Sequence, residues 1–492
     1  MGSHSGFHSL REETTAAIDV TGDLPGWLDG SLVRNGPGAF SFPDGSGVDH
    51  WFDGLAMLYR FTFDPGTTEN GGTVHYRNRF LRTDAYEDAV DGEFEGGFAT
   101  GETTLRGRLA GLLSEPYDNT NVIVERIGEE YVALTESPRR VRFDPNTLGT
   151  IGHADSDGDG VPSGQLSCAH LKRDPTTGAV VNVDTAFGRT CRYHVYAWTP
   201  DGERRHVGSV ETDEPAYMHS FALTPRYVVL TEFPFRLDPL RFLKPGRQAP
   251  FIEQFEWEPD RGTRIVVVDR TTGAVVAEPV TDAVFGFHHV NAFERNGGAE
   301  IVFDLETVPD ATTIDSLYLE NVRAGEMGAI VGEIERFTVD LGGDPGAQNG
   351  TGPSGATVSR EMLYDDGSAL PTVSPARWCR RHRYVYAMGL DTPVTEWARR
   401  IVKIDADAET ASMFDDGGDY FGEPIFVPAP EGDAEDAGVV LTVALDTEAD
   451  RSRLLVLDGE TFTERARATL PHAAPFDFHG RYFPELRAAT EA

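Results

Sequence analysis

Short runs of roughly four to eight residues, rich in apolar side chains, alternate with polar turn residues along almost the whole chain. Examples are "YVALTE", "RYVVLTEF", "TRIVVVDR", "RYVYAMGL" and "GVVLTVAL", which turns of Gly, Pro, Asp and Thr-Gly separate. Such runs are typical of β-strands, and helical periodicity is rare. The pattern predicts an all-β barrel, sandwich or propeller.

A turn unit recurs in similar form, as in "FDPNTLGTIG", "RDPTTGAVV", "VDRTTGAVV" and "LDGETFTERA". Each unit predicts the end of one strand, a turn of the D-x-x-T-G type and the start of the next strand. Hairpins repeated at intervals of tens of residues are typical of propeller blades. We therefore predict a single β-propeller domain over residues 1–492, with a short flexible N-terminal tail at about residues 1–12.

Three segments interrupt the strand pattern. The pattern of residues 104–114 predicts a short amphipathic helix. Residues 233–257 form an apolar, Pro-containing insertion, which indicates a cap over one propeller face, a surface that touches lipid, or both. Residues 155–160, "DSDGDG", resemble the start of a calcium loop, but Leu166 stands where a bidentate Glu is required, so we expect a solvated acidic turn.

The charge is strongly acidic, with 80 acidic against 43 basic residues and a formal net charge of -37. Such a chain repels nucleic acid, so no nucleic-acid partner is expected. Only three of the basic residues are lysines, at positions 172, 244 and 403, and the rest are arginines. An ordinary acidic protein would not explain the missing lysines, so the composition predicts a protein from a halophile.

The sequence shows no clear feature of an exported or membrane-spanning protein. The three cysteines are too few and too scattered for a disulfide framework, and no signal peptide or apolar run of about 18 residues is evident. We expect a cytoplasmic protein.

Four histidine positions lie at the ends of strand-like runs: His170, His219, the pair His288 and His289, and His479. Their separations are too long for a local metal motif. In a propeller, however, such spacing places one side chain on the inner strand of each of several blades, directed at the axis. Neighbouring residues of a strand point to opposite faces, so only one of His288 and His289 would face a shared centre.

Eight motifs carry a resemblance to a known family. They are "LVRNGPG", "HWFDGLAMLYRFTF", "LTESPRRVRFDPNTLGTIG", "AHLKRDPTTG", "MHSFALTPRYVVLTEFPF", "FHHVNAFE", "GEPIFVP" and "FHGRYFP". In order and spacing, the sequence resembles the carotenoid cleavage oxygenases. The resemblance implies a seven-bladed β-propeller with a loop and helix cap over the metal-bearing face. It also implies a non-haem Fe(II), held by four histidines, that cleaves a double bond of a carotenoid, apocarotenoid or stilbenoid with O2.

The family pattern assigns the residues of the site. It gives His170, His219, His288 and His479 as the metal ligands and catalytic residues, with His288 chosen by its H-x-x-N spacing to Asn291. His289 is then a packing residue or a neighbour of the ligands. Two further matches are Glu136 and Glu423, which would orient ligating rings. Thr120 matches a position near an open iron site, and a plain turn residue is the alternative.

The donor set agrees with this chemistry. Four neutral imidazoles suit a borderline divalent metal and leave its full positive charge, with two octahedral positions open for O2 and water. Four histidines would close the tetrahedral site that zinc prefers. Only the resemblance favours iron in particular.

The sequence also departs from the family pattern. Ala369 stands where a third orienting glutamate would be, so one ring would depend on water, a carbonyl or another side chain, or the protein would bind iron weakly or lack activity. Leu55, Ala56 and Tyr59 also differ. Thr135 replaces the Lys that stilbenoid-cleaving relatives place before the first glutamate, which favours a polyene over a phenol.

The expected function is that of an Fe(II)-dependent dioxygenase. It would cleave a carotenoid or apocarotenoid with O2 to aldehydes of the retinal or apocarotenal type. Residues 233–257 would form the tunnel mouth and a peripheral membrane contact. The alternatives are a stilbenoid-cleaving or isomerising member, or a non-catalytic propeller that binds a lipid.

Overall fold

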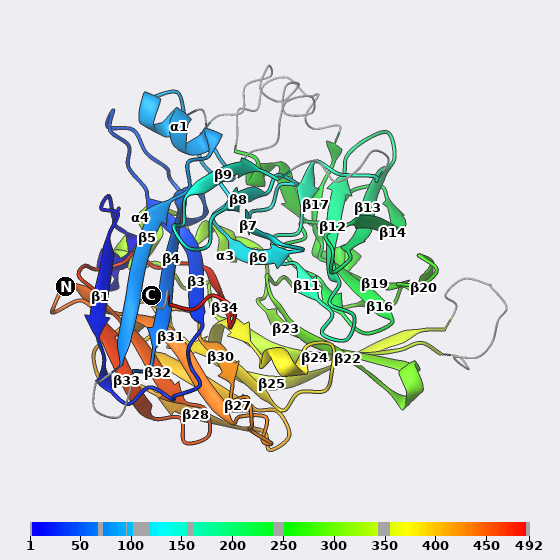
Figure 1. The fold of residues 1–492 in the computed structure, drawn as a ribbon. Coiled ribbons are helices and arrows are strands. Elements are labelled where there is room, and N and C mark those ends of the chain that lie inside the picture. Colours follow the sequence, from blue (N-terminus) through cyan, green and yellow to red (C-terminus); the bar gives the residue numbers. More distant parts are fainter. Residues whose placement is uncertain are drawn as a thin grey trace.

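Antiparallel β-sheets make up most of the molecule (Figure 1). A computed structural model describes residues 2–66, 72–94, 96–101, 118–154, 161–239, 250–342 and 355–488. Helices in these parts are few and short, so the predicted all-β class is confirmed. They are α1 (Asp84–Asp91), α3 (Thr312–Asp315), α4 (Leu319–Ala324) and the 3-10 turns Ser3–Phe7, Trp51–Asp53, Ile252–Gln254, Pro259–Arg261, Asn296–Gly298 and Pro375–Arg377.

Two sheets join the beginning of the chain to its end. One has the order β1 (Thr15–Asp19), β5 (Thr73–Phe80), β4 (Leu55–Asp64), β3 (Ser31–Ala39) and β34 (His479–Phe483). The other comprises β2 (Thr21–Gly22), β33 (Glu464–Thr469), β32 (Arg451–Asp458), β31 (Gly438–Asp446), β30 (Ile425–Pro428) and β29 (Tyr420–Phe421). In Figure 1 the red β34 lies beside the blue β3. Asn35 pairs with His479, so this closure fixes one of the four histidines.

Three sheets come from the middle of the chain, together with a two-stranded hairpin. The first contains β6 (Ile123–Ile127), β7 (Glu130–Leu134), β8 (Val141–Phe143) and β9 (Thr150–His153). The second contains β10 (Leu166–Ser167), β11 (Lys172–Arg173), β12 (Val180–Ala186), β13 (Cys191–Trp198) and β14 (Arg204–Thr212). The third contains β15 (Ala222–Leu223), β16 (Tyr227–Glu232), β19 (Thr263–Asp269), β20 (Val275–Ala277) and β21 (Val280–Thr281), and β17 (Phe235–Leu237) pairs with β18 (Phe255–Trp257).

One long strand, β25 (Thr357–Thr372), joins two groups of strands into a single sheet. On one side of it lie β24 (Gly332–Asp340), β23 (Glu300–Thr307) and β22 (His289–Arg295), and on the other lie β26 (Tyr384–Gly389), β27 (Arg400–Asp405) and β28 (Thr410–Phe414). The first part of β25 pairs with β24 and its last part pairs with β26, with breaks in register on both sides. Each group with β25 is a four-stranded unit.

The recurrent D-x-x-T-G turns form as predicted. In the turn between β11 and β12, Oδ1 of Asp174 accepts hydrogen bonds from the backbone N–H groups of Thr176 and Thr177. Gly178 then adopts a φ of 73°, in the left-handed region that glycine enters without strain. Asp269 makes the same bonds in the turn between β19 and β20, and Gly273 has a φ of 72°.

Some expectations concern segments at the margins of this fold. The N-terminal segment, expected to be a flexible tail, is anchored by Phe7, which is fully buried and lies edge-on to Trp51, Trp397 and Phe476. The predicted helix at 104–114 and the acidic turn at 155–160 lie outside the described residues, as do residues 240–249 of the apolar insertion. No helix in the described part of the chain has the length and apolar character needed to cross a membrane.

Candidate metal centre

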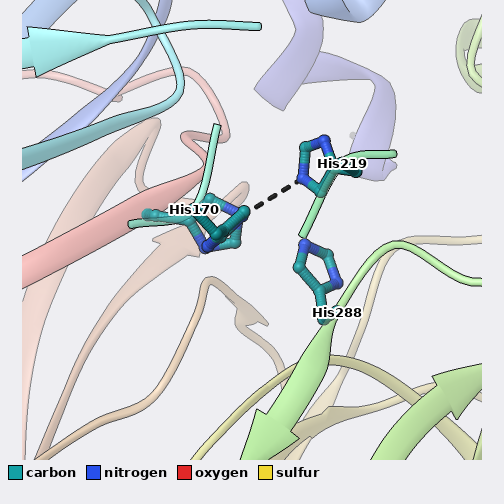
Figure 2. Close-up of side chains that lie close together, drawn as sticks. His170, His219 and His288 are labelled. Carbon is teal, nitrogen blue, oxygen red and sulfur yellow. Dashed lines mark hydrogen bonds between the residues drawn. The ribbon is translucent and has the colours of Figure 1, made fainter. Parts of the chain in front are cut away.

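Four histidine rings meet at one point, each supplied by a different sheet. His170 lies between β10 and β11, His219 precedes β15, His288 precedes β22, and His479 begins β34. One ring nitrogen from each lies within 4.8 Å of the others. Figure 2 shows three of these rings, and the dashed line joins the Nε2 atoms of His170 and His219, which are 3.1 Å apart. The structure thus brings together all four histidines that the sequence pattern selected.

Three of the rings are oriented by buried or partly buried glutamates. The Nδ1–H of His219 donates to Oε1 of Glu136 at 2.5 Å, and the Nδ1–H of His479 donates to Oε1 of Glu423 at 2.7 Å. The third carboxylate is Glu306, whose Oε2 lies 2.6 Å from Nδ1 of His288. A ring that donates through Nδ1 keeps the lone pair on Nε2 free for a metal, and carboxylates commonly fix metal-binding histidines in this way.

The remaining donor atoms fit a cation. Nε2 of His288 is buried and has no hydrogen-bond partner, although a buried polar nitrogen is normally paired. Burial, together with the neighbouring rings, lowers the pKa of His170 and of His288 well below the ordinary value. Burial also lowers the pKa of His479, against the opposing effect of Glu423. These three imidazoles are therefore neutral at physiological pH, which is the state that binds a divalent metal.

His289 lies outside the cluster. Its Nδ1 contacts the Ser220 hydroxyl at 2.8 Å and its Nε2 contacts the Thr231 hydroxyl at 2.8 Å. Both ring nitrogens are thus occupied by neighbouring side chains, and the ring is almost fully buried. The opposite directions of adjacent side chains separate the two histidines, as expected for residues at the start of a strand.

Glu306 occupies the orienting role that the family pattern places at the position of Ala369. Ala369 lies on β25, two strands away from Glu306 on β23, and the carboxylate for His288 comes from β23. Between them on β24 lies Gly332, where a Cβ atom would come within 2.7 Å of the Glu306 side chain. The alternation of "EIVFDLET" offered a signal, because Asp304 and Glu306 are acids on one face of an otherwise apolar strand. Burial raises the pKa of Glu306 to about 8, so its ionised form at neutral pH depends on positive charge of the kind that a bound metal would supply.

The other predicted positions occupy the surrounding core. Thr120 is fully buried, its carbonyl accepts a hydrogen bond from Asn35, and its hydroxyl has no partner. Leu55, Ala56 and Tyr59 are buried in β4, where they pack the core.

An aromatic wall adjoins the cluster on the side of His219. The ring of Phe287 lies 5.3 Å from that of His219, edge to face, and the Tyr217 hydroxyl donates to Glu136 at 2.6 Å. Phe285 packs on Phe287, Tyr217 and Phe235. The described flanks of the insertion 233–257 join this wall through β17 and β18, and most of their apolar side chains are buried. Tyr217 and Phe285 are buried in this aromatic core, whereas Phe287 is partly exposed and offers a ring that can contact a flat, apolar ligand.

Comparisons with known proteins match this chain over nearly its full length. The family model described as retinal pigment epithelial membrane protein matches residues 7–484. The human beta,beta-carotene 15,15'-dioxygenase is 30% identical over 95% of this chain and 92% of its own. The human mitochondrial carotenoid-cleaving dioxygenase is 29% identical over 94% of this chain and 88% of its own.

Solved structures also match this chain over nearly its full length. A mutant of the Synechocystis apocarotenoid oxygenase superposes with a TM-score of 0.83 at 27% identity, covering 98% of both chains. A cobalt-substituted form of that protein gives a TM-score of 0.82 with the same identity and coverage. Fold and site together thus define a protein with a cluster of four histidines, suited to a metal, on an all-β scaffold. The chain belongs to the retinal pigment epithelial membrane protein family, that of the carotenoid cleavage oxygenases.

Proposed function

We propose that this protein is an Fe(II)-dependent oxygenase that cleaves a C=C bond of a carotenoid or apocarotenoid with O2 to give aldehydes. The observation that carries the proposal is the cluster of four histidines, three of them oriented by carboxylates, beside an aromatic wall. The names of the relatives support the choice of a polyene substrate.

The metal ligands would be the four clustered histidines, which present neutral nitrogen donors. Iron fits better than zinc, because four histidines would complete a tetrahedral zinc site and leave no position for a reactant. When bound, iron(II) supplies the one-electron chemistry that lets O2 react with an electron-rich double bond. The carboxylates of Glu136, Glu306 and Glu423 would keep the rings directed inward, and Thr120 would border an open position.

The protein's other task is to position the polyene. Phe287 and Tyr217 would hold its flat chain beside the cluster and keep water away from the reacting bond. Residues 233–257 would form the tunnel mouth and contact the membrane in which such substrates dissolve. The scaffold would be one domain of seven blades, with the long strand β25 shared by two of them.

Product analysis tests this proposal. The protein would be loaded with Fe(II) and incubated under O2 in molar KCl with β-carotene, a long apocarotenal or a stilbenoid, and products identified by mass spectrometry. We expect discrete aldehydes from a polyene, and none from the stilbenoid because Thr135 offers no ammonium group to a phenol. An isomer without cleavage, or iron bound with no product from any substrate, would contradict the proposal.

Two neighbouring variants make the test specific. His288→Ala removes a proposed ligand, whereas His289→Ala removes the same side chain from the adjacent, buried position. We expect His288→Ala to lose iron and product, and folded His289→Ala to keep both. Equal loss in two variants that are both folded by circular dichroism would contradict the assignment of ligands.

A further inference from the structure

The histidine cluster borders open space on the side away from the aromatic wall. A cavity of about 620 Å³ is lined by His170, His288 and His479, but not by His219, Tyr217 or Phe287. Its wall also contains charged side chains, among them Lys172, Arg481 and Glu125. The cavity therefore meets the cluster from a side that carries charged as well as apolar side chains.

Lys172 is the unusual charge in this wall. Its ammonium donates one hydrogen bond, to the carbonyl of His289 at 2.8 Å, and no described carboxylate lies within ion-pair distance of it. Lys403, the other lysine of the described chain, donates to Asp436 at 2.6 Å and to the Gly459 carbonyl at 2.7 Å. An ammonium has three donors and is strongly hydrated, so an enclosed one needs a counter-charge. Lys172 lacks a counter-charge from the protein.

The acids nearby are already engaged by other cations. Glu125 is shared by two guanidinium groups, those of Arg173 at 2.8 Å and Arg481 at 3.2 Å. Arg481 also lies over the Trp378 ring, with 4.7 Å to its centroid. Two cations on one carboxylate leave an excess of one positive charge, and Lys172 adds a second.

The remaining acids of the wall offset part of this excess. Glu423 accepts from the His479 ring and from the backbone N–H of Gly480. Glu129 and Glu485 both pair with Arg126. Glu423 keeps its negative charge because these donors are neutral, and the exposed group of Glu129, Glu485 and Arg126 at the mouth carries one more. The inner part of the wall is left with one positive charge, that of the unpaired Lys172, within a chain of net charge -37.

We infer that the cavity binds a small monovalent anion of the halide class, in contact with the Lys172 ammonium. A halide needs one or two N–H donors and a positive potential, which Lys172 and Arg481 provide. A phosphate would need several converging donors, whereas the free donors here are the Lys172 ammonium and the buried Nε of Arg481, which has no hydrogen-bond partner. This inference does not depend on which metal or substrate the histidine cluster takes.

Bromide is a probe whose position diffraction can identify. Crystals of the full chain grown in sodium bromide should show an anomalous peak in contact with Nζ of Lys172. Lys172→Met should lose this peak, while Lys403→Met, which removes a paired lysine, should keep it. Bromide peaks on the surface only, or a cavity peak that persists in Lys172→Met, would overturn the inference.

Chloride NMR tests the same site in solution. We expect the wild-type chain to broaden the chloride line and added bromide to reverse the effect. Lys172→Arg keeps the positive charge and should keep most of the broadening, and Lys172→Gln should lose the bromide-reversible part. Equal broadening by the wild type and by folded Lys172→Gln would overturn the inference.

Discussion

Glu306 is the carboxylate that contacts the His288 ring in the described structure, so the direction of that ring depends on it. In Glu306→Gln, the amide oxygen can still accept from Nδ1–H, but the charge is lost. Losing a carboxylate partner commonly weakens metal binding by about 10- to 100-fold. We expect a decrease in Fe(II) affinity of that order, measured by competition with a chelator.

The matched control for this variant lies on the same strand. Glu300 also belongs to β23, but it contacts Asn296 and Arg295 at the surface end. Glu300→Gln should leave Fe(II) affinity unchanged. If both variants bind iron like the wild type, Glu306 has no part in positioning His288.

The position of Ala369 allows a rescue experiment. Family relatives place the orienting glutamate at the position of Ala369, so the site should accept a carboxylate from either strand. We expect Glu306→Ala to bind Fe(II) more weakly than Glu306→Gln, and Ala369→Glu to restore part of the affinity in the Glu306→Ala background. Iron content after dialysis would be compared. A double variant no better than Glu306→Ala would show that β25 cannot supply the carboxylate in this chain.

The sequence identified most of the site at the residue scale. The four histidines and two of the glutamates occupy motifs that are recognisable from neighbouring letters, such as His288-x-x-Asn291. Glu306 was missed because its function depends on which strand lies beside which. Gly332 leaves room for its side chain from β24, and that contact joins residues far apart in the chain. The local alternation marks Glu306 as an acid on an otherwise apolar strand, but it does not show that this acid meets His288.

At the scale of elements, the closure of β3 on β34 depends on Arg34. This guanidinium is fully buried, and it donates to Asp477 at 2.5 and 2.6 Å and to the carbonyl of Glu423 at 3.1 Å. It therefore ties the residues before β34 to the segment that carries Glu423.

We expect Arg34→Met to lower the free energy of unfolding by about 3–5 kcal/mol, because it leaves Asp477 as an unpaired buried charge. Chemical denaturation would measure this change. Arg467→Met, which removes a partly exposed pair with Glu464 on β33, should cost less than about 1 kcal/mol. Similar costs for the two variants would mean that the Arg34 pair does not stabilise the closure.

The β-strands themselves were easier to predict than the strands with which they pair. Alternating apolar runs and Asp-Thr-Gly turns identified strands such as β16, β19 and β31 from local residues alone. The pairing of β3 with β34 could not be read in this way, since it joins the two ends of the chain. The sequence also did not predict that β25 joins two groups of strands, because a break in register has no clear sequence pattern.

For the whole molecule, the net charge of -37 sets how stability responds to salt. Many arginines pair with acids, as Arg383 does with Asp405, and salt weakens exposed pairs of this kind. Acids nevertheless outnumber basic residues by nearly two to one, so repulsion between carboxylates outweighs attraction. The screening length falls from about 10 Å at 0.1 M salt to about 3 Å at 1 M, which removes most of that repulsion.

We therefore expect the midpoint of thermal unfolding to rise between 0.1 M and 2 M KCl, as the halophilic composition predicts. Sucrose at matched osmolality separates screening from solute exclusion, since it stabilises proteins without screening charge. The rise should be steepest at low salt, where the screening length changes most, and should flatten above about 1 M. A midpoint that falls with KCl would mean that the arginine pairs, and not the excess acids, dominate the electrostatic energy of the fold.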